Sequence, residues 1–391
     1  MFLLLSTLVS CKRFALLYAG SNGYWNYRHQ ADIFTIYNQL LDRGFTSYDM
    51  AVYAYDDIAT DSMNPFPGQV FHSIDHKVNV FPGDQAINVK GDKVTAHALY
   101  NAISTLPTSR NDYIFMYYDN HGGPGILGVP DGCGEDIAAA SLAEAFTNCS
   151  NKHSYKQFLF LIEACYAGSV AQEITAPNLA IITAANDAES SYAAVYDEAL
   201  GTYLSNEFSN NFIALIDESP DITVGELYNT LKTQTKESHV TYYGDESMKS
   251  QSLSTFIGTP SKTMKHNIDR SKLQLVKPKQ ATEKTFEFLS SHEKVSIRAR
   301  ARLQQLRLKA QTEKLEAVLD LLVKYVDPKN YDMIMNDTQS KITPTYYEVL
   351  NVFIKRFGKI NPDDYGRLMV IKALAATHTK AEIVQGIFAI L

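Results

Sequence analysis

The sequence of 391 residues contains only four cysteines, which are too few for a disulfide scaffold. No cysteine and histidine cluster has the spacing of a zinc site, and no phosphate-binding loop, heptad array or internal repeat is present. Beyond the N-terminal segment, no run approaches the ~18 apolar residues of a membrane-spanning helix. We therefore expect neither a zinc protein nor a membrane span, and a soluble mature chain without a cofactor.

The N-terminal segment is the most apolar part of the chain. Phe2 to Val9 form an apolar run that Ser10, Cys11 and two basic residues follow, without a charged side chain before the run. This pattern resembles a very short secretory signal peptide over residues 1–11. Cys11 would leave with it or lie beside its cleavage point, whereas Cys133 and Cys149 either pair or remain free thiols.

The composition changes near Gly258-Thr259-Pro260, and the length of the chain is enough for two domains. Before this point, apolar strand patterns alternate with helical ones, and a hydrophobic content of 45% supports a full core. After it, apolar residues recur at three- and four-residue steps in long helical patterns. We expect a domain of α/β class over 12–260, a linker over 261–292 and a helical domain over 293–391, with helices at 293–325, 346–357, 362–375 and 380–390.

Charge is unevenly divided between the two parts. Residues 1–261 carry 13 lysines and arginines against 29 acidic residues, a net charge of −16, whereas residues 262–391 carry a net charge of +9. A basic tail often indicates binding to nucleic acid or another anionic surface. Here the acidic first part is already a partner for it, so we expect no nucleic-acid partner.

Two strand patterns end in residues that can perform covalent chemistry. Tyr113 to Tyr118 run into Asp119-Asn120-His121-Gly122, and Phe158 to Ile162 run into Glu163-Ala164-Cys165. Because the carboxyl ends of parallel strands meet at one edge of a sheet, a thiol and an imidazole would lie together there. Each alone is more often a buried small residue or a loop residue. The order and the separation of 44 residues, with a helix-length segment at 137–147 between them, favour a cysteine nucleophile with a histidine base.

Further sequence blocks carry a resemblance to a known family. They are Ala19 to Asp32, Tyr55 to Ala59 with Asn64-Pro65, His121-Gly122, Glu163-Ala164-Cys165 and Glu189 to Ala193. In this order, over roughly residues 14 to 258, they resemble the legumains, the asparaginyl endopeptidases. The resemblance implies a caspase-like, mostly parallel sheet flanked by helices, followed by a C-terminal all-α prodomain. It also implies cleavage of peptide bonds after asparagine and, less well, aspartate, in an acidic lysosome-like vesicle or in a secreted space.

The residues of the reaction follow from this comparison. Cys165 would attack the scissile carbonyl, and His121 would take the thiol proton and pass it to the leaving amine. By resemblance, Asn26 orients the imidazole. The backbone N–H groups of Gly122 and Cys165 would form the oxyanion hole. Positive φ angles at glycines 122, 123 and 125 are an alternative reason for these glycines.

A pocket for an asparagine side chain needs both a donor and an acceptor. Arg28 can donate to the carboxamide oxygen, and Glu163 can accept from the amide NH₂ group, although the two can also form a plain ion pair. His29, Ser190 and Ser191 match other pocket positions of the family. Asn206 stands where legumains have an aspartate. We expect this uncharged residue to weaken discrimination against aspartate in the substrate.

By resemblance, the helical tail is a propeptide that covers the active site. Opposite charges would hold it at neutral pH, and acid would release it. Asn267 is the nearest candidate for self-cleavage. Expected partners are peptide or protein substrates, the prodomain itself as an intramolecular inhibitor, and cystatin-like inhibitors. Two alternatives stay open, namely a peptide ligase or transamidase that uses the same thioester, and a non-enzymatic binding protein on an inactive protease fold.

Overall fold

The computed structural model describes residues 11–218, 222–260 and 273–391. Almost all of the predicted signal peptide and the candidate cleavage residue Asn267 lie outside these residues. Within them, seven strands form one sheet in the order β12-β9-β8-β4-β1-β2-β3, and all pair in parallel except β12. Their bounds are β1 (Arg13–Ala19), β2 (Met50–Ala54), β3 (Val89–Lys90), β4 (Tyr113–Asp119), β8 (Gln157–Glu163), β9 (Leu179–Thr183) and β12 (Thr241–Gly244).

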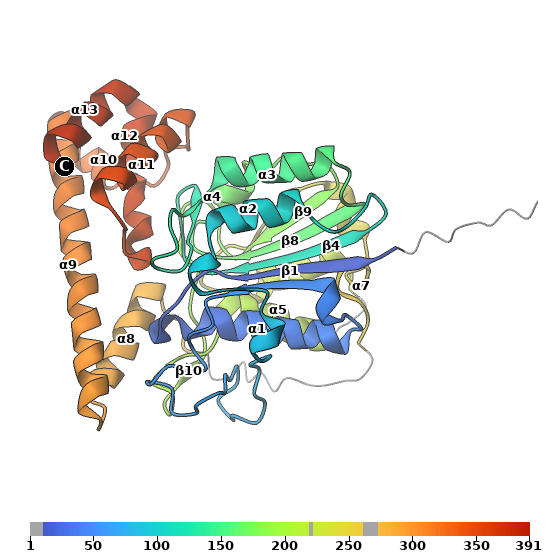
Figure 1. Ribbon diagram of the computed structural model, residues 1–391. Helices are drawn as coiled ribbons and strands as arrows, with labels where there is room; N and C mark the ends of the chain where they lie inside the picture. The colour runs from blue at the N-terminus through green and yellow to red at the C-terminus, as the bar shows by residue number, and fades with distance from the viewer. Residues whose placement is uncertain (1–10, 219–221, 261–272) are drawn as a thin grey trace, which may run out of the picture.

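The sheet lies between two layers of helices (Figure 1). One layer contains α1 (Tyr27–Asp42), α5 (Glu207–Glu218), α6 (Val224–Gln234) and α7 (Ser254–Ile257). The other contains α2 (Ala96–Ser104), α3 (Ala139–Asn151) and α4 (Gly168–Ala171). The central strands are apolar along their whole length because both faces are covered. In β1, for example, Ala15 and Leu17 enter one core while Leu16 and Tyr18 enter the other.

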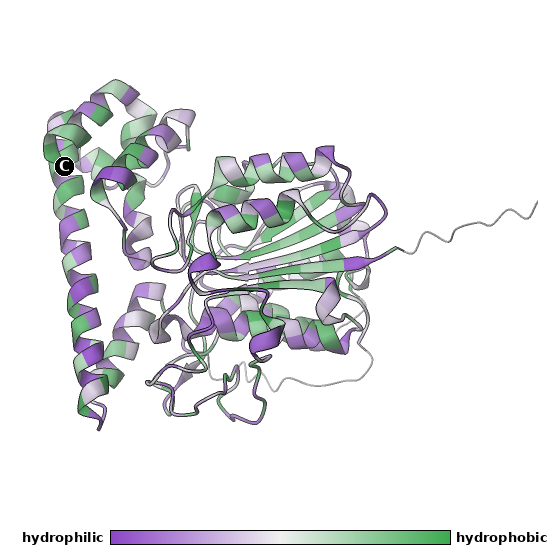
Figure 2. Cartoon of the chain, viewed as in Figure 1, coloured by the Kyte–Doolittle hydropathy of each residue, from purple (hydrophilic) through white to green (hydrophobic). Residues whose placement is uncertain are grey.

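The C-terminal part is helical, as predicted. Its helices are α8 (Pro278–Ser290), α9 (Val295–Val326), α10 (Tyr331–Met335), α11 (Pro344–Phe357), η8 (Pro362–Leu368), α12 (Met369–Thr377) and α13 (Lys380–Ile390). The last five pack with the C-terminal half of α9 around their own apolar core. In the N-terminal half of α9, hydrophilic and hydrophobic residues alternate in Figure 2. The predicted fold class, a mostly parallel sheet flanked by helices with a helical C-terminal region, is confirmed.

Two details differ from the expected elements. Residues 137 and 138, predicted as the start of a helix, form the short strand β7 (Ile137–Ala138), which pairs with β6 (Ile126–Leu127) before α3 begins. Within the segment predicted as a linker, α8 forms and packs on the first domain through contacts of Trp25 with Phe286. Cys133 and Cys149 are separate buried thiols.

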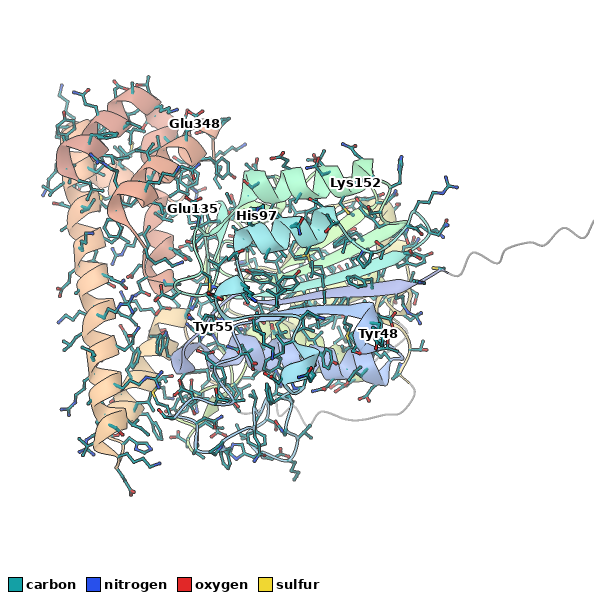
Figure 3. All side chains as sticks on the ribbon, viewed as in Figure 1. Tyr48, Tyr55, His97, Glu135, Lys152 and Glu348 are labelled. Carbon is teal, nitrogen blue, oxygen red and sulfur yellow. The ribbon has the colours of Figure 1, made fainter. Side chains whose placement is uncertain are left out.

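The helical part also faces the first domain across a cavity of about 520 Å³. Figure 3 shows His97 and Glu135 on the side of the first domain that this cavity borders, and α11 supplies the opposite wall. Nearby, Asp136 accepts hydrogen bonds from Lys359 at 3.0 Å and from the Tyr365 hydroxyl at 2.7 Å. These contacts attach the helical part beside the carboxyl ends of the strands.

Candidate active site

The loops after β4 and β8 meet at the carboxyl edge of the sheet. Asp119 and Glu163 are directly paired in register, so His121 and Cys165 each follow two residues later from neighbouring strands. A Cβ atom at Gly122 would lie 2.3 Å from the carbonyl oxygen of Cys165, which is too close for any side chain. The glycine at 122 is therefore required by this close approach. The alternative of positive φ angles applies only to Gly125 of the three glycines (φ 69°).

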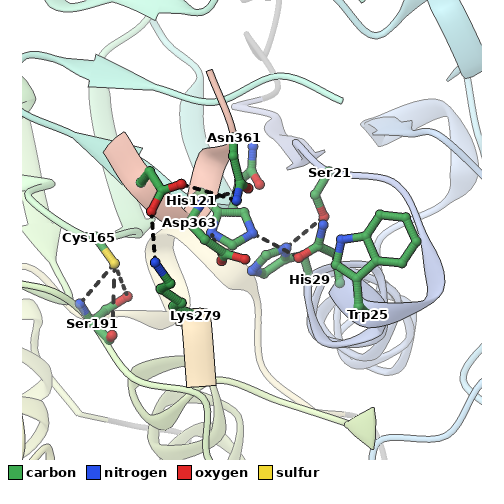
Figure 4. Close-up of polar contacts among 12 residues, drawn as sticks. Ser21, Trp25, His29, His121, Cys165, Ser191, Lys279, Asn361 and Asp363 are labelled. Carbon is green, nitrogen blue, oxygen red and sulfur yellow. Dashed lines mark hydrogen bonds and ion pairs between the residues drawn. The ribbon is translucent and has the colours of Figure 1, made fainter. Parts of the chain in front are cut away.

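Cys165 is buried at the end of its strand, and its Sγ atom faces Ser191 (Figure 4). The Ser191 N–H donates to Sγ at 3.3 Å, and the Ser191 Oγ lies 3.8 Å away. Burial raises the pKa of the Cys165 thiol, and the Ser191 hydrogen bonds partly oppose this increase. The next residue, Tyr166, has a φ of 55°, a conformation that costs a non-glycine residue roughly 1–3 kcal/mol. The chain thus turns sharply directly after the thiol.

The tautomer of His121 follows from its hydrogen bonds. Asn26 Nδ2 donates to the carbonyl oxygen of Asn22 at 3.0 Å, so the Asn26 Oδ1 atom points the other way. This oxygen lies 2.8 Å from His121 Nε2, and an amide oxygen only accepts, so Nε2 carries the proton. His121 Nδ1 is then left as the basic nitrogen. Burial lowers the pKa of His121, and the positive charges of Arg28 and Lys359 lower it further.

A second buried imidazole supports the first. The His29 ring lies edge-on to the His121 ring, with centroids 5.0 Å apart, and its Nδ1 atom is 2.6 Å from the Ser21 hydroxyl. Burial also lowers the pKa of His29. The sequence pattern did not identify Ser21, which lies with His29 in the block from Ala19 to Asp32.

The predicted pocket residues Arg28 and Glu163 have polar atoms without partners. Arg28 is buried and donates from Nε to Asn206 Oδ1 at 2.9 Å and from Nη1 to the Trp25 carbonyl at 3.3 Å. Its Nη2 atom and both carboxyl oxygens of Glu163 are buried without a hydrogen-bond partner among the described residues. The plain ion pair between Arg28 and Glu163 is not formed. Burial raises the pKa of Glu163 to about 8.

Asn206 lies at the centre of a buried polar network that the sequence did not reveal. Its Nδ2 atom donates to Asp32 Oδ2 at 3.1 Å and to Asp119 Oδ1 at 2.9 Å. Burial and the neighbouring carboxyls of Asp32 and Glu163 raise the pKa of Asp119 well above its ordinary value. An aspartate at 206 would lose both donated hydrogen bonds. In the sequence, this network is indicated only by the positions of its residues. Asp119 ends β4 as Glu163 ends β8, and Asp32 follows Arg28 by one helical turn.

The helical part of the chain reaches into this site. Asp363 Oδ1 lies 3.6 Å from His121 Nδ1, and the Asp363 side chain is almost fully buried. Next to it, Lys279 Nζ and Asp364 Oδ1 are 3.2 Å apart (Figure 4). A cavity of about 720 Å³ remains, lined by His121, Gly122, Cys165 and Ser190 on one side and by residues of α8, α9, η8 and α12 on the other. The occupant of the site therefore comes from the C-terminal part.

Every predicted site residue within the described ranges lies at this edge of the sheet. Cys165, His121, Gly122 and Ser190 line the cavity directly, and Ser191 contacts the thiol. Asn26 and His29 contact or border the imidazole, whereas Arg28, Glu163 and Asn206 lie behind it in the buried network. Asp32, Asp119, Ser21 and Asp363 are additions that the tertiary structure supplies.

Several known proteins are similar to this chain in sequence. The chain is 34% identical over 263 residues to the hemoglobinase of Schistosoma japonicum. The aligned region covers 64% of this chain and 61% of that protein. It is 33% identical over 275 residues to the vacuolar-processing enzyme delta-isozyme of Arabidopsis thaliana, and this match covers 63% of this chain and 58% of that enzyme. It is 31% identical over 271 residues to mouse legumain, with coverage of 65% of this chain and 60% of that protein. The chain thus spans about three fifths of the length of these relatives.

Among solved structures, caspase-1 of Spodoptera frugiperda matches with a TM-score of 0.39 and 10% identity, covering 64% of this chain and 93% of that one. No helix in the part of the chain that the structure describes is both long and apolar enough to cross a bilayer. The sequence model of the Peptidase C13 family matches residues 13–259, the whole α/β part that holds the thiol and the imidazole. The chain therefore belongs to the Peptidase C13 family.

Proposed function

We propose that this protein is a cysteine endopeptidase that hydrolyses peptide bonds after asparagine. The observation that carries the proposal is a set of buried polar atoms without partners on Arg28 and Glu163, behind the thiol and the imidazole. Arg28 Nη2 is a donor without an acceptor, and Glu163 has two oxygens without a donor. Buried polar groups without partners cost about 1–3 kcal/mol each, so they are expected to have a ligand. A carboxamide, with one oxygen and one NH₂ group, matches both.

The geometry supports the following sequence of steps. His121 Nδ1 takes the proton of Cys165 Sγ, and the thiolate attacks the carbonyl carbon of the scissile bond. The N–H groups of Gly122 and Cys165 stabilise the negative oxygen of the tetrahedral intermediate. As this intermediate collapses to a thioester, His121 passes its proton to the leaving amine. Water, deprotonated by His121, then attacks the thioester and releases the acid and the thiol. Asn26 holds the ring in the required tautomer throughout.

Matched peptides with Asn, Asp, Gln or Ala before the scissile bond test this proposal after incubation of the full chain near pH 5. We expect the Asn peptide to be cleaved with a kcat/KM at least about 100-fold above that of the Ala peptide, because Ala leaves both Arg28 and Glu163 unpaired. Equal cleavage of the four peptides would contradict the proposed pocket. A lack of any cleavage would favour the binding-protein alternative.

A second prediction concerns the pocket residue that differs from the family pattern. We expect Asn206→Asp to raise the ratio of cleavage after Asn to cleavage after Asp severalfold, because a carboxylate beside Arg28 compensates the charge that attracts an acidic substrate. The neighbouring carboxyls of Asp32 and Asp119 favour the neutral form of the new acid, so it is ionised less at pH 4 than at pH 6. The change in the cleavage ratio should therefore be larger at pH 6. Measured kcat/KM ratios for paired peptides decide this, and an unchanged ratio at both pH values would refute it.

We also propose that the helical part keeps the full chain inactive and that acid releases it. It supplies the side chains that cover Cys165 and His121. Ion pairs join its basic residues to the acidic first part, as the charge division predicts; they are Arg300–Asp61 at 3.0 Å, Arg307–Asp131 at 3.5 Å and Lys359–Asp136 at 3.0 Å. This role would fit a protein of an acidic vesicle or a secreted space.

The pKa values of the buried histidines indicate the direction in which pH shifts the balance between the closed and open forms. Burial lowers the pKa of both His121 and His29 in the closed form. His121 faces Asp363 and is near Lys359 of the helical part, so once that part leaves, the pKa of His121 returns toward about 6.5 and the open form binds more protons below that pH. This contribution to the stability of the closed form is therefore fully present above pH 6.5 and is lost as the pH falls. This direction agrees with activation by acid.

A further inference from the structure

The carboxyl of Asp32 is fully buried in the polar network around Asn206 and is surrounded by hydrogen-bond donors. Its Oδ2 atom accepts from the Asn206 N–H at 3.0 Å and from Asn206 Nδ2 at 3.1 Å. Its Oδ1 atom accepts from the Ser205 hydroxyl at 2.5 Å and lies 2.8 Å from His72 Nε2. A carboxylate oxygen only accepts, so His72 Nε2 carries a hydrogen and donates it. One oxygen of Asp32 thus serves Asn206, and the other serves Ser205 and His72.

The Asp32 carboxyl determines which way the Asn206 amide faces. The NH₂ group of this amide donates to Asp32 and Asp119, and the amide oxygen accepts from Arg28 Nε at 2.9 Å. A half-turn of the amide would place its oxygen against two carboxyls and its NH₂ group against a guanidinium, which only donates. The observed orientation is therefore fixed as long as Asp32 keeps its place. Arg28, in turn, depends on Asn206 for the acceptor of its Nε atom.

His72 belongs to the long segment between β2 and β3, which is held in place by contacts outside the predicted pocket. Val80 N–H donates to the Val70 carbonyl at 2.7 Å, so the segment folds back on itself. Phe71 N–H donates to the Tyr27 hydroxyl at 2.5 Å and attaches the segment to the start of α1. The next side chain, that of His72, is only 4% exposed and contacts the buried carboxyl on the same helix. The imidazole is therefore held at this carboxyl from outside the pocket.

The charge of Asp32 acts on the whole network. Burial and the charge of Asp32 raise the pKa values of both Asp119 and Glu163. A buried carboxylate that loses one of its donors is destabilised by more than a neutral group is, because hydrogen bonds to charged groups are stronger. Without His72, the Asp32 carboxylate would therefore turn toward another donor. That rotation would move the oxygen to which the Asn206 amide donates.

From these contacts we propose that His72 is a positioning residue for the recognition of the asparagine carboxamide. Its Nε2–H group fixes the Asp32 carboxylate, which orients the Asn206 amide, and that amide holds Arg28. This inference rests on the proposed function and adds to it a specificity determinant outside the pocket. His72 does not line the cavity at the thiol, so it acts through Arg28 and not on the substrate itself.

The test compares cleavage of an Asn peptide and an Ala peptide by the acid-activated full chain. His72→Leu removes the donor and keeps a buried side chain of similar size. We expect the ratio of kcat/KM for Asn to kcat/KM for Ala to fall about tenfold, through a higher KM for the Asn peptide at a kcat within about twofold of wild type. The Ala peptide should be cleaved at an unchanged rate, because it has no carboxamide for Arg28 to bind. An unchanged ratio, or an equal loss for both peptides, would overturn the inference.

A conservative variant separates the hydrogen bond from the packing of the imidazole. In His72→Gln, the side-chain NH₂ group can donate to Asp32 from nearly the same place as the imidazole Nε2. This variant should restore the ratio of Asn to Ala cleavage to within about threefold of wild type, and a ratio as low as that of His72→Leu would overturn the inference. If His72→Leu does not fold, His72→Phe removes the same donor with a ring of similar shape. The same fall is expected there, and an unchanged ratio would again overturn the inference.

A second histidine of the same segment provides a matched control. His76 Nε2 lies 2.7 Å from Asp197 Oδ2, and this carboxyl also accepts from the N–H groups of Ala199 and Leu200. His76→Asn withdraws the shorter side chain from Asp197, and asparagine tolerates the positive φ of 51° at this position. The ratio of Asn to Ala cleavage should remain that of the wild-type protein. A fall equal to that of His72→Leu would show that any loosening of the segment is sufficient, and would overturn the inference.

The result for the wild-type protein separates this inference from the proposed function. Equal cleavage of the Asn and Ala peptides by the wild-type protein would contradict the proposed function itself. A preference for Asn that persists unchanged in His72→Leu would remove only the role of His72.

Discussion

Cys165→Ala is expected to lower cleavage of the Asn peptide by roughly a million-fold, to the background of the assay. The variant removes the sulfur atom that forms the thioester in the proposed mechanism, and the other groups of the site have no role in that covalent chemistry without it. The side chain is small and the change leaves a cavity of one sulfur atom, so the fold should remain. Initial rates at pH 5, with circular dichroism and the Tm as checks on the fold, measure this effect.

Cys149→Ala is the matched control, since Cys149 is also a fully buried thiol but lies on α3, away from the carboxyl edge of the sheet. It should retain wild-type activity. Substantial residual cleavage by Cys165→Ala would show that another nucleophile acts, and equal loss in both variants would show that the effect arises from folding. Either result would remove Cys165 from the assigned role.

Asp363→Asn is expected to hold the full chain closed at neutral pH. Burial raises the pKa of Asp363 to about 6, although the charge of Arg28 partly opposes the shift. The pKa of Asp363 in the closed form is thus about two units above its ordinary value of 3.8. At pH 7, where the carboxylate is charged, this difference destabilises the closed form relative to the open form by about 3 kcal/mol. Asparagine carries no charge at any pH, so the open fraction should be roughly 100-fold smaller in the variant.

The pH dependence of this effect has a definite sign. A carboxyl whose pKa is raised in the closed form binds its proton more tightly there, so acid stabilises this one contact between about pH 6 and pH 4. The wild-type chain and Asp363→Asn should therefore differ at pH 7 and become similar near pH 4. His121 acts in the opposite direction, and acid activation requires that its effect exceeds that of Asp363.

Hydrogen exchange of the loops that carry His121 and Cys165 measures the open fraction of the full chain at each pH. Asp332→Asn is the control, because Asp332 is an exposed acid of the same helical part. It should exchange like the wild-type chain. Faster exchange of Asp363→Asn at pH 7, or a difference that persists at pH 4, would contradict the proposed role of this carboxyl.

Much of the fold and the reacting pair could be predicted from local patterns. The strands at Tyr113–Asp119 and Gln157–Glu163 are continuous apolar runs, which is typical of strands buried on both faces. Because parallel strands align their carboxyl ends, the residues after these runs had to meet, and Gly122 lies against Cys165 as this rule requires. The helical tail was likewise visible as a change of period and of charge.

Other features depend on residues that are far apart in the sequence. Asn206 contacts Arg28 and Asp32 of α1 and Asp119 of β4, so its role as a bridge between buried carboxyls has no local pattern. Asp363 reaches His121 from 242 positions along the chain, and Val276 pairs with Ala193 from 83 positions away. The sequence by itself determined which side chains can react and which strands carry them, because periodicity and strand ends are local properties. Only the tertiary structure decided what fills the pocket and what covers the thiol, because burial and close packing depend on all parts of the chain together.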